Sequence, residues 1–187
     1  MAIGALISSL VLLAAGPATL TLAQADTSPV TTSQTSPDKQ ASADALAKGE
    51  APFPSGAPAD DYGLMGWCYG ALSGHLNLYA QVLPEVKRIE GEFPDKDRTI
   101  ADVMKDYAAQ HAAGEKILTT YARVISLEET AGKTHGQKRP AVIARGRQVW
   151  KGSDKADPRQ LAQLWMSWGL PDRCQATAKR LAPGRAE

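Results

Sequence analysis

The feature that most constrains the fold is a long apolar stripe in which residues recur at alternating steps of four and three. Only an α-helix brings residues at this spacing onto one side of the chain. No stretch of the sequence alternates apolar and polar residues between hairpin turns, as a strand would. The stripe consists of Leu64, Cys68, Ala71, His75, Leu78, Val82, Val86, Ile89 and Phe93. The sequence therefore predicts one long helix, kinked at Pro84 because proline removes a backbone donor.

A second stripe with the same spacing follows after the turn at Phe93-Pro94-Asp95. Thr99 and Asp102 form a capping-box pattern at its start, and Gly132 is a typical stop. The stripe consists of Ile100, Met104, Tyr107, His111, Gly114, Leu118, Tyr121 and Ile125. Two long helices of matched period joined by a short loop predict an antiparallel hairpin with coiled-coil-like packing.

Three shorter helices are expected after the hairpin. The first spans Pro140 to Trp150, the second starts at the Asp157-Pro158 cap and ends at Gly169, and the third spans residues 172–181. The second should present one apolar face made of Leu161, Leu164, Trp165 and Trp168. The predicted fold class is all-α: a helical bundle built on a long antiparallel helical hairpin with three shorter C-terminal helices.

A glycine ridge runs along the first helix at Gly66, Gly70 and Gly74. Each glycine costs roughly 1 kcal/mol in a helix interior, so we expect a compensating close approach of a neighbouring helix. An alternative is a lipid-inserting segment, since residues 62–83 carry no charged side chain and G-x-x-x-G occurs in membrane dimers. His75, Asn77 and Gln81 favour the water-soluble reading because polar groups are costly in lipid.

The N-terminal residues predict export. Residues 1–25 have the order of a secretory signal peptide: a short apolar run, a Gly-Pro break and a small-x-small site at Ala23-Gln24-Ala25. An uncleaved membrane anchor is the alternative, because no Lys or Arg precedes the apolar run. Residues 26–58 are rich in Ser, Thr, Pro and Ala and predict a disordered tether. The helical domain should then span residues 59–183, with a flexible tail at 184–187, in a periplasmic or secreted protein.

Cys68 and Cys174 are the two cysteines of the chain. In an exported protein such a pair usually forms a disulfide, which here would join the first helix to the last. The alternative is a reactive thiolate at Cys174, because the first turn of a helix lowers the pKa of a thiol. The absence of C-x-x-C spacing favours the disulfide.

His75 and His111 lie on the two apolar stripes and, with Tyr107 and Tyr121, define a candidate ligand pocket in the bundle core. If the chain turns near residue 96, facing residues sum to roughly 192, which offsets the imidazoles by on the order of 9 Å along the axis. This offset disfavours a shared metal ion, and we predict neither metal nor cofactor. The other interpretation is that both histidines are used in core packing.

Charge is distributed unevenly although 21 Lys and Arg nearly balance 20 Asp and Glu. Residues 60–132 carry a net charge of −5 (7 − 12) and residues 133–187 a net charge of +8 (12 − 4). The halves could neutralise each other, or the basic half could face an anionic polymer or a membrane surface. The candidate surface consists of Lys138, Arg139, Arg145, Arg147 and Lys151. Net charge gives no reason to expect a nucleic-acid partner.

No catalytic or dinucleotide-binding motif stands out in the sequence. We therefore expect a non-catalytic envelope or periplasmic interaction module that binds another envelope protein or an anionic surface. A small-molecule or cofactor carrier with a pocket in the bundle core is the alternative. An enzyme, for instance one that uses His111 with Glu115, is the third hypothesis and has the least support. The sequence indicates no oligomeric state.

Overall fold

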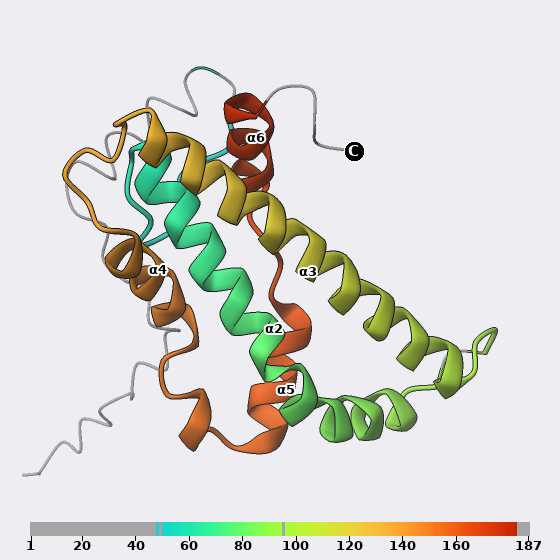
Figure 1. Ribbon diagram of the computed structural model, residues 1–187. Coiled ribbons are helices and arrows are strands. Elements are labelled where there is room, and N and C mark those ends of the chain that lie inside the picture. Colours follow the sequence, from blue (N-terminus) through green and yellow to red (C-terminus); the bar gives the residue numbers. More distant parts are fainter. Residues whose placement is uncertain (1–47, 49, 95, 183–187) are drawn as a thin grey trace, which may run out of the picture. The chain divides into compact units, whose positions relative to one another are not determined.

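The computed structural model describes residue 48, residues 50–94 and residues 96–182, which are mostly helical and contain no strand. Its α-helices are α2 (Asp61–Glu92), α3 (Ile100–Thr130), α4 (Arg139–Arg147), α5 (Pro158–Ser167) and α6 (Asp172–Leu181), with the short 3-10 turns η1 (Gln148–Trp150) and η2 (Ser153–Lys155) (Figure 1). The prediction of a mostly helical protein is therefore confirmed. The predicted signal peptide (1–25), most of the predicted tether and the predicted tail (184–187) lie outside the described residues.

Local sequence signals set the helix ends. Asp60 caps α2 by accepting a hydrogen bond from the Gly63 amide at 2.8 Å. The predicted capping box of Thr99 and Asp102 begins α3. Gly132, with a φ of +70°, follows the end of α3, and glycine adopts this left-handed conformation without the clash that a Cβ atom would cause.

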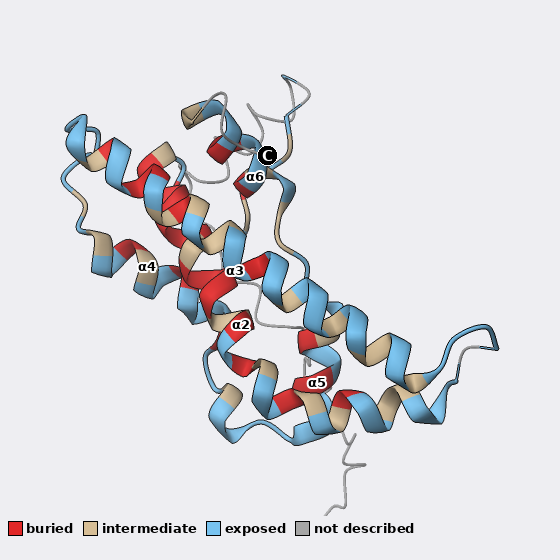
Figure 2. Cartoon of the chain, turned by 45° about the vertical axis from the view of Figure 1, so that its right-hand side comes forward, coloured by how far each residue is buried: buried red, intermediate tan, exposed pale blue. Residues whose placement is uncertain are grey.

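α2 is the centre of the domain, because α3, α4, α5 and α6 all pack against it. Its stripe is buried or half-buried from Leu64 to Val86, and the buried positions follow α2 in Figure 2. Two apolar clusters divide the core. The first joins the N-terminal half of α2 to α3, α4 and α6, and the second joins its C-terminal half to α5 and Trp150. Among the described helices, none has an apolar stretch long enough to cross a membrane.

Two aromatic residues depart from the predicted stripes. α2 contains Pro84, changes direction in its C-terminal part (Figure 1) and ends at Glu92, so Phe93 leaves the helix and is 74% exposed. α5 ends at Ser167, before the predicted Gly169, and Trp168 continues in extended backbone. Leu164, expected on the apolar face of α5, is 51% exposed because the buried face is centred on Leu161 and Trp165.

Residues 50–58, which the sequence assigned to the tether, lie against the helices. Phe53 and Ala57 belong to the buried core. Two arginines hold this segment: Arg145 donates to the Gly56 carbonyl at 2.7 Å, and the Arg173 guanidinium lies 3.8 Å from the centre of the Phe53 ring. The packed domain therefore includes residues before position 59. Composition did not reveal this because the contacts come from α4 and α6, far away in the sequence.

The two cysteines form the expected disulfide. Cys68 in α2 and Cys174 in α6 are both fully buried, and their bond spans 106 residues of sequence. The other end of α6 is tied to the start of α2 by Arg180, which donates two hydrogen bonds to Asp61. The last helix is thus fixed to the first at two places.

The glycine ridge of α2 faces α4. A side chain at Gly66 would meet Val142, one at Gly70 would meet the backbone of α4, and one at Gly74 would meet the Trp150 ring. Gly146 of α4 faces the Trp67 carbonyl in the same way. The close approach that the glycine spacing predicts is therefore an approach of two helix backbones.

We expect Gly70→Ala to lower the free energy of unfolding by at least about 2 kcal/mol, because its Cβ would overlap the α4 backbone rather than a movable side chain. Gly91→Ala is the matched control in the same helix, since nothing lies within 4 Å of the added Cβ. This control should stabilise by about 0.5–1 kcal/mol through helix propensity. Urea unfolding of both variants measures the difference. Equal effects would exclude the backbone contact as the cause.

Removal of the disulfide in a Cys68→Ala, Cys174→Ala double variant should destabilise the domain by about 4–5 kcal/mol, because the bond closes a loop of about 100 residues. Calorimetry of the oxidised protein and of the double variant measures this loss. Reduction of the native protein should give the same shift in Tm. An unchanged Tm in the double variant would contradict the structural role of the bond.

Candidate functional site

His75 is surrounded by tryptophan rings. Its imidazole stacks on Trp165, with centroids 4.5 Å apart and planes 4° apart, and on Trp168 at 4.7 Å. Trp150 lies 5.5 Å away. Trp165 also donates its indole hydrogen to the His75 carbonyl at 2.9 Å. The rings of α5 and its flanks therefore occupy the space beside His75, where the sequence suggested a ligand.

The titration of His75 is shifted by this environment. Burial, and secondarily the charge of His111, lower the pKa of His75 from 6.5 to about 4. Its Nδ1 atom is buried and has no hydrogen-bond partner among the described residues. The imidazole is therefore neutral at neutral pH and acts as one more ring in an aromatic cluster.

Of the other three candidate pocket residues, His111 and Tyr107 join the ring contacts around Trp165 that include His75, whereas Tyr121 lies in the other cluster. His111 packs on Tyr79, with centroids 4.3 Å apart, and its Nδ1 lies 4.0 Å from Glu115. Tyr107 contacts Trp165, with centroids 5.8 Å apart, in the second cluster. Tyr121 belongs to the first cluster, and its buried hydroxyl has no partner among the described residues. In the described part of the chain, no three His, Cys, Asp or Glu side chains gather as metal ligands would.

The five predicted cationic residues of the α4 region divide into two groups. Arg139 is paired with Glu129 and also donates to Ser126 at 2.8 Å, and its hydrogen bond holds the pKa of Glu129 below the usual value. Arg145 binds the Gly56 carbonyl. Lys138, Arg147 and Lys151 are exposed and form no ion pair with the described residues. They form what we call the α4 cationic face.

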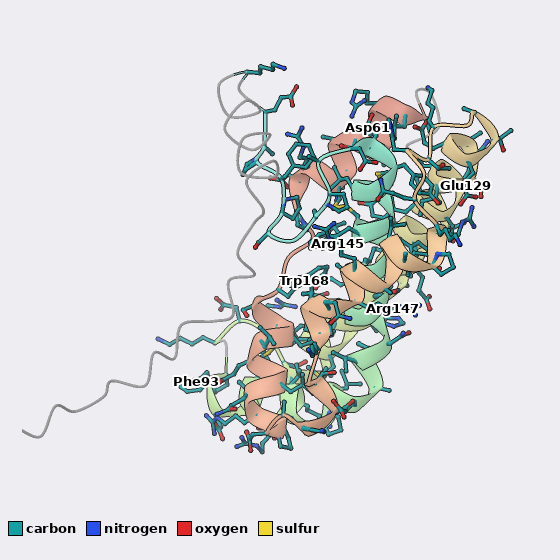
Figure 3. The ribbon with its side chains drawn as sticks, turned by 90° about the vertical axis from the view of Figure 1, so that its left-hand side faces the viewer. Asp61, Phe93, Glu129, Arg145, Arg147 and Trp168 are labelled. Carbon is teal, nitrogen blue, oxygen red and sulfur yellow. A yellow bond between two sulfur atoms is a disulfide. The ribbon has the colours of Figure 1, made fainter. Side chains whose placement is uncertain are left out.

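The segment that carries the α4 cationic face has no acidic residue of its own. No Asp or Glu occurs between Lys133 and Ser153. Figure 3 shows two of the region's arginines, Arg145 and Arg147, projecting from α4. The helix α4, which carries or adjoins these cations, packs closely on α2 at glycine positions.

The structure also contains a pocket that the sequence did not predict. Its volume is about 370 Å³, and it lies where α2 ends and α3 begins, with Met166 of α5 at one side. Its walls include Glu90, Phe93, Arg98, Asp106 and Tyr107. The Phe-Pro turn marked this place in the sequence, but the predicted stripe had placed Phe93 in the core.

Two polar contacts organise the walls of this pocket. Tyr107 donates its hydroxyl to Glu90 at 2.6 Å, and burial together with the Glu90 carboxylate raises the pKa of Tyr107, so the phenol stays protonated. Arg98 is paired with Asp106. In the pocket, the charges of Arg98 and Asp106 therefore cancel, whereas the Glu90 carboxylate is bonded to an uncharged hydroxyl.

No protein-family model, curated protein or solved structure matches this chain significantly. Its function is therefore argued from the geometry of these sites.

We expect His75→Phe to flatten the acid branch of the stability profile. Burial lowers the pKa of His75 to about 4 in the folded protein, whereas in the unfolded chain its pKa is 6.5. As the pH falls, the unfolded chain therefore takes up a proton at this histidine before the folded protein does. The free energy of unfolding is unaffected by His75 protonation above pH 6.5 and decreases as the pH falls from 6.5 toward 4. Phenylalanine retains the ring stack without titrating.

Tm values measured from pH 7.5 to 4.5 test this expectation, which requires a smaller fall for His75→Phe than for the unsubstituted protein. His135→Asn is the control: His135 is exposed and has a φ of +51°, which asparagine tolerates, so its profile should follow that of the parent. Parallel profiles for all three proteins would show that His75 does not carry the effect.

Proposed function

We propose that this protein is an exported, non-catalytic interaction module of the cell envelope that binds an anionic partner through the α4 cationic face. The observation that carries the proposal is that Lys138, Arg147 and Lys151 are exposed without an ion-pair partner among the described residues, in a segment lacking Asp and Glu. Cations without an ion-pair partner create a positive local potential, which attracts a polyanion or an anionic membrane surface.

The anchoring of α4 supports this proposal. Trp150 follows α4 and donates its indole hydrogen to the Ala71 carbonyl of α2 at 2.8 Å. With the glycine contacts, this bond fixes both ends of the helix on α2. Cations on a fixed backbone lose less conformational freedom on binding than cations on a loose segment.

The disulfide supports the exported location, because such bonds persist in oxidising compartments. The predicted signal peptide is the other support, and it lies outside the described residues.

We also propose that α2 and α3 form the long antiparallel hairpin predicted from their stripes. Three contacts support this, because residues of increasing number in α2 contact residues of decreasing number in α3. Tyr62 bonds Glu129 at 2.9 Å, Leu76 lies against Gly114, and Glu90 bonds Tyr107 at 2.6 Å. A hairpin would give α4 and α5 one continuous support.

We favour an interaction module over the small-molecule carrier because a ligand beside His75 would have to displace Trp165 and Trp168, both stacked on it. The proposed binding surface instead consists of side chains that are already exposed, so no rearrangement is needed.

The test replaces the α4 cationic face with Lys138→Gln, Arg147→Gln and Lys151→Gln. Each cation near an anionic surface contributes about 1 kcal/mol, so we expect roughly a hundred-fold weaker binding to vesicles rich in phosphatidylglycerol or to inorganic polyphosphate. Sedimentation with vesicles and calorimetry with polyphosphate measure the loss. Binding of the parent protein should weaken steeply with added salt.

The matched control replaces three exposed lysines of α2 and α3 in Lys87→Gln, Lys105→Gln and Lys116→Gln. It has the same net charge as the first variant and should retain most of the affinity. Equal losses in the two triple variants would reduce the effect to net charge, and retained affinity in the α4 variant would reject the proposed surface.

A further inference from the structure

The pocket at the α2–α3 turn lies at one end of the described helices. Figure 3 shows Phe93 projecting at the end opposite to Asp61 and Glu129, where α2 begins and α3 ends. Residues 50–58 pack near that other end, through Arg145 and Arg173. Residues 50–58 therefore lie away from the pocket.

The size of the pocket suits a small ligand, and its mainly polar lining also includes apolar side chains. Its volume of about 370 Å³ falls in the lower part of the range for small-molecule sites. Ile100, Val103 and Met166 supply apolar walls, and the Phe93 ring at the edge is 74% exposed. An apolar group that entered would remove the Phe93 ring from water, which favours binding.

The net charge of the pocket lining determines which ligand charge it favours. Arg98 is occupied by Asp106, so it does not compensate Glu90. Glu90 is half-buried, and its hydrogen-bond partner is the neutral Tyr107 hydroxyl, with no ion pair among the described residues. The lining therefore retains one excess negative charge, in a pocket that also includes the Phe93 and Tyr107 rings. Carboxylates and aromatic faces both attract cations.

From this combination we propose that the pocket binds an apolar cation: an ammonium or guanidinium group attached to an apolar body, with the charge on Glu90 and the body against Phe93 and Met166. The same chemistry is available from a free amine or from a basic side chain flanked by apolar residues in a peptide. This site is independent of the α4 cationic face.

The experiment uses the full, disulfide-bonded protein and three probes. Phenethylamine represents the free amine, an acetylated and amidated Phe-Arg-Phe tripeptide represents the peptide source, and phenylpropionate has a similar apolar body with a negative charge. Calorimetry gives the affinities, and shifts of the Met166 methyl and Gln110 amide NMR signals locate the binding. We expect at least one cationic probe to bind with shifts at both signals, and at least ten-fold weaker binding of phenylpropionate.

Two carboxylate variants in one helix separate the local charge from the net charge. Glu90→Gln retains an acceptor for the Tyr107 hydroxyl but removes the charge, and it should weaken cation binding at least ten-fold. Glu85→Gln is the matched control, because Glu85 is already paired with Arg88; it should leave the affinity within two-fold. Circular dichroism confirms that both variants fold.

Tighter binding of the tripeptide than of phenethylamine would identify a peptide source, and the reverse order a free amine; either result supports the cation site. Three results would overturn it: no binding of either cation, binding of phenylpropionate as tight as that of phenethylamine, or equal losses in Glu90→Gln and Glu85→Gln. Shifts confined to residues away from the α2–α3 turn would overturn it as well.

Discussion

The contact of the α2 and α4 backbones is the interaction on which the rest of the structure depends. Gly70 of α2 and Gly146 of α4 each lie where any side chain would strike the partner's backbone. Glycine is costly inside a helix, and close packing of the two helices offsets that cost. The contact sets where α4 ends and where Trp150 enters the core. Trp150 in turn forms part of the ring cluster that closes over His75.

That ring cluster explains how a rather short C-terminal region completes the core. Trp150, Trp165 and Trp168 come from η1, from α5 and from the segment after α5, and they converge on one imidazole of α2. The indole groups of Trp150 and Trp165 also donate hydrogen bonds to backbone carbonyls of α2. A polar histidine can therefore lie in an aromatic environment because it stays neutral there.

The two proposed binding surfaces have opposite charge and lie on different parts of the domain. The α4 cationic face has no acidic neighbours in its own segment, whereas the pocket beside Phe93 has a carboxylate that forms no ion pair with the described residues. Such a distribution would let one small module contact two partners of different chemistry. The disulfide and the Arg180–Asp61 pair keep α6 on α2 while either surface is engaged.

Local signals in the sequence determined the helical class, the helix starts at Thr99 and Asp157, and the stop at Gly132, because caps and turns depend on neighbours within a few residues. The cysteine pair and the glycine spacing indicated that distant contacts must exist. The glycine spacing did not indicate which helix would approach.

Tertiary structure alone decided the rest. The core position of Phe53, the exposure of Phe93 and the stacking of Trp168 on His75 each depend on residues far away in the sequence. The excess charge at Glu90 likewise appears only once Arg98 is seen to pair with Asp106. A periodic pattern reports which face of a helix is apolar, but what covers that face, and where it is left uncovered, follows from how separate helices meet in space.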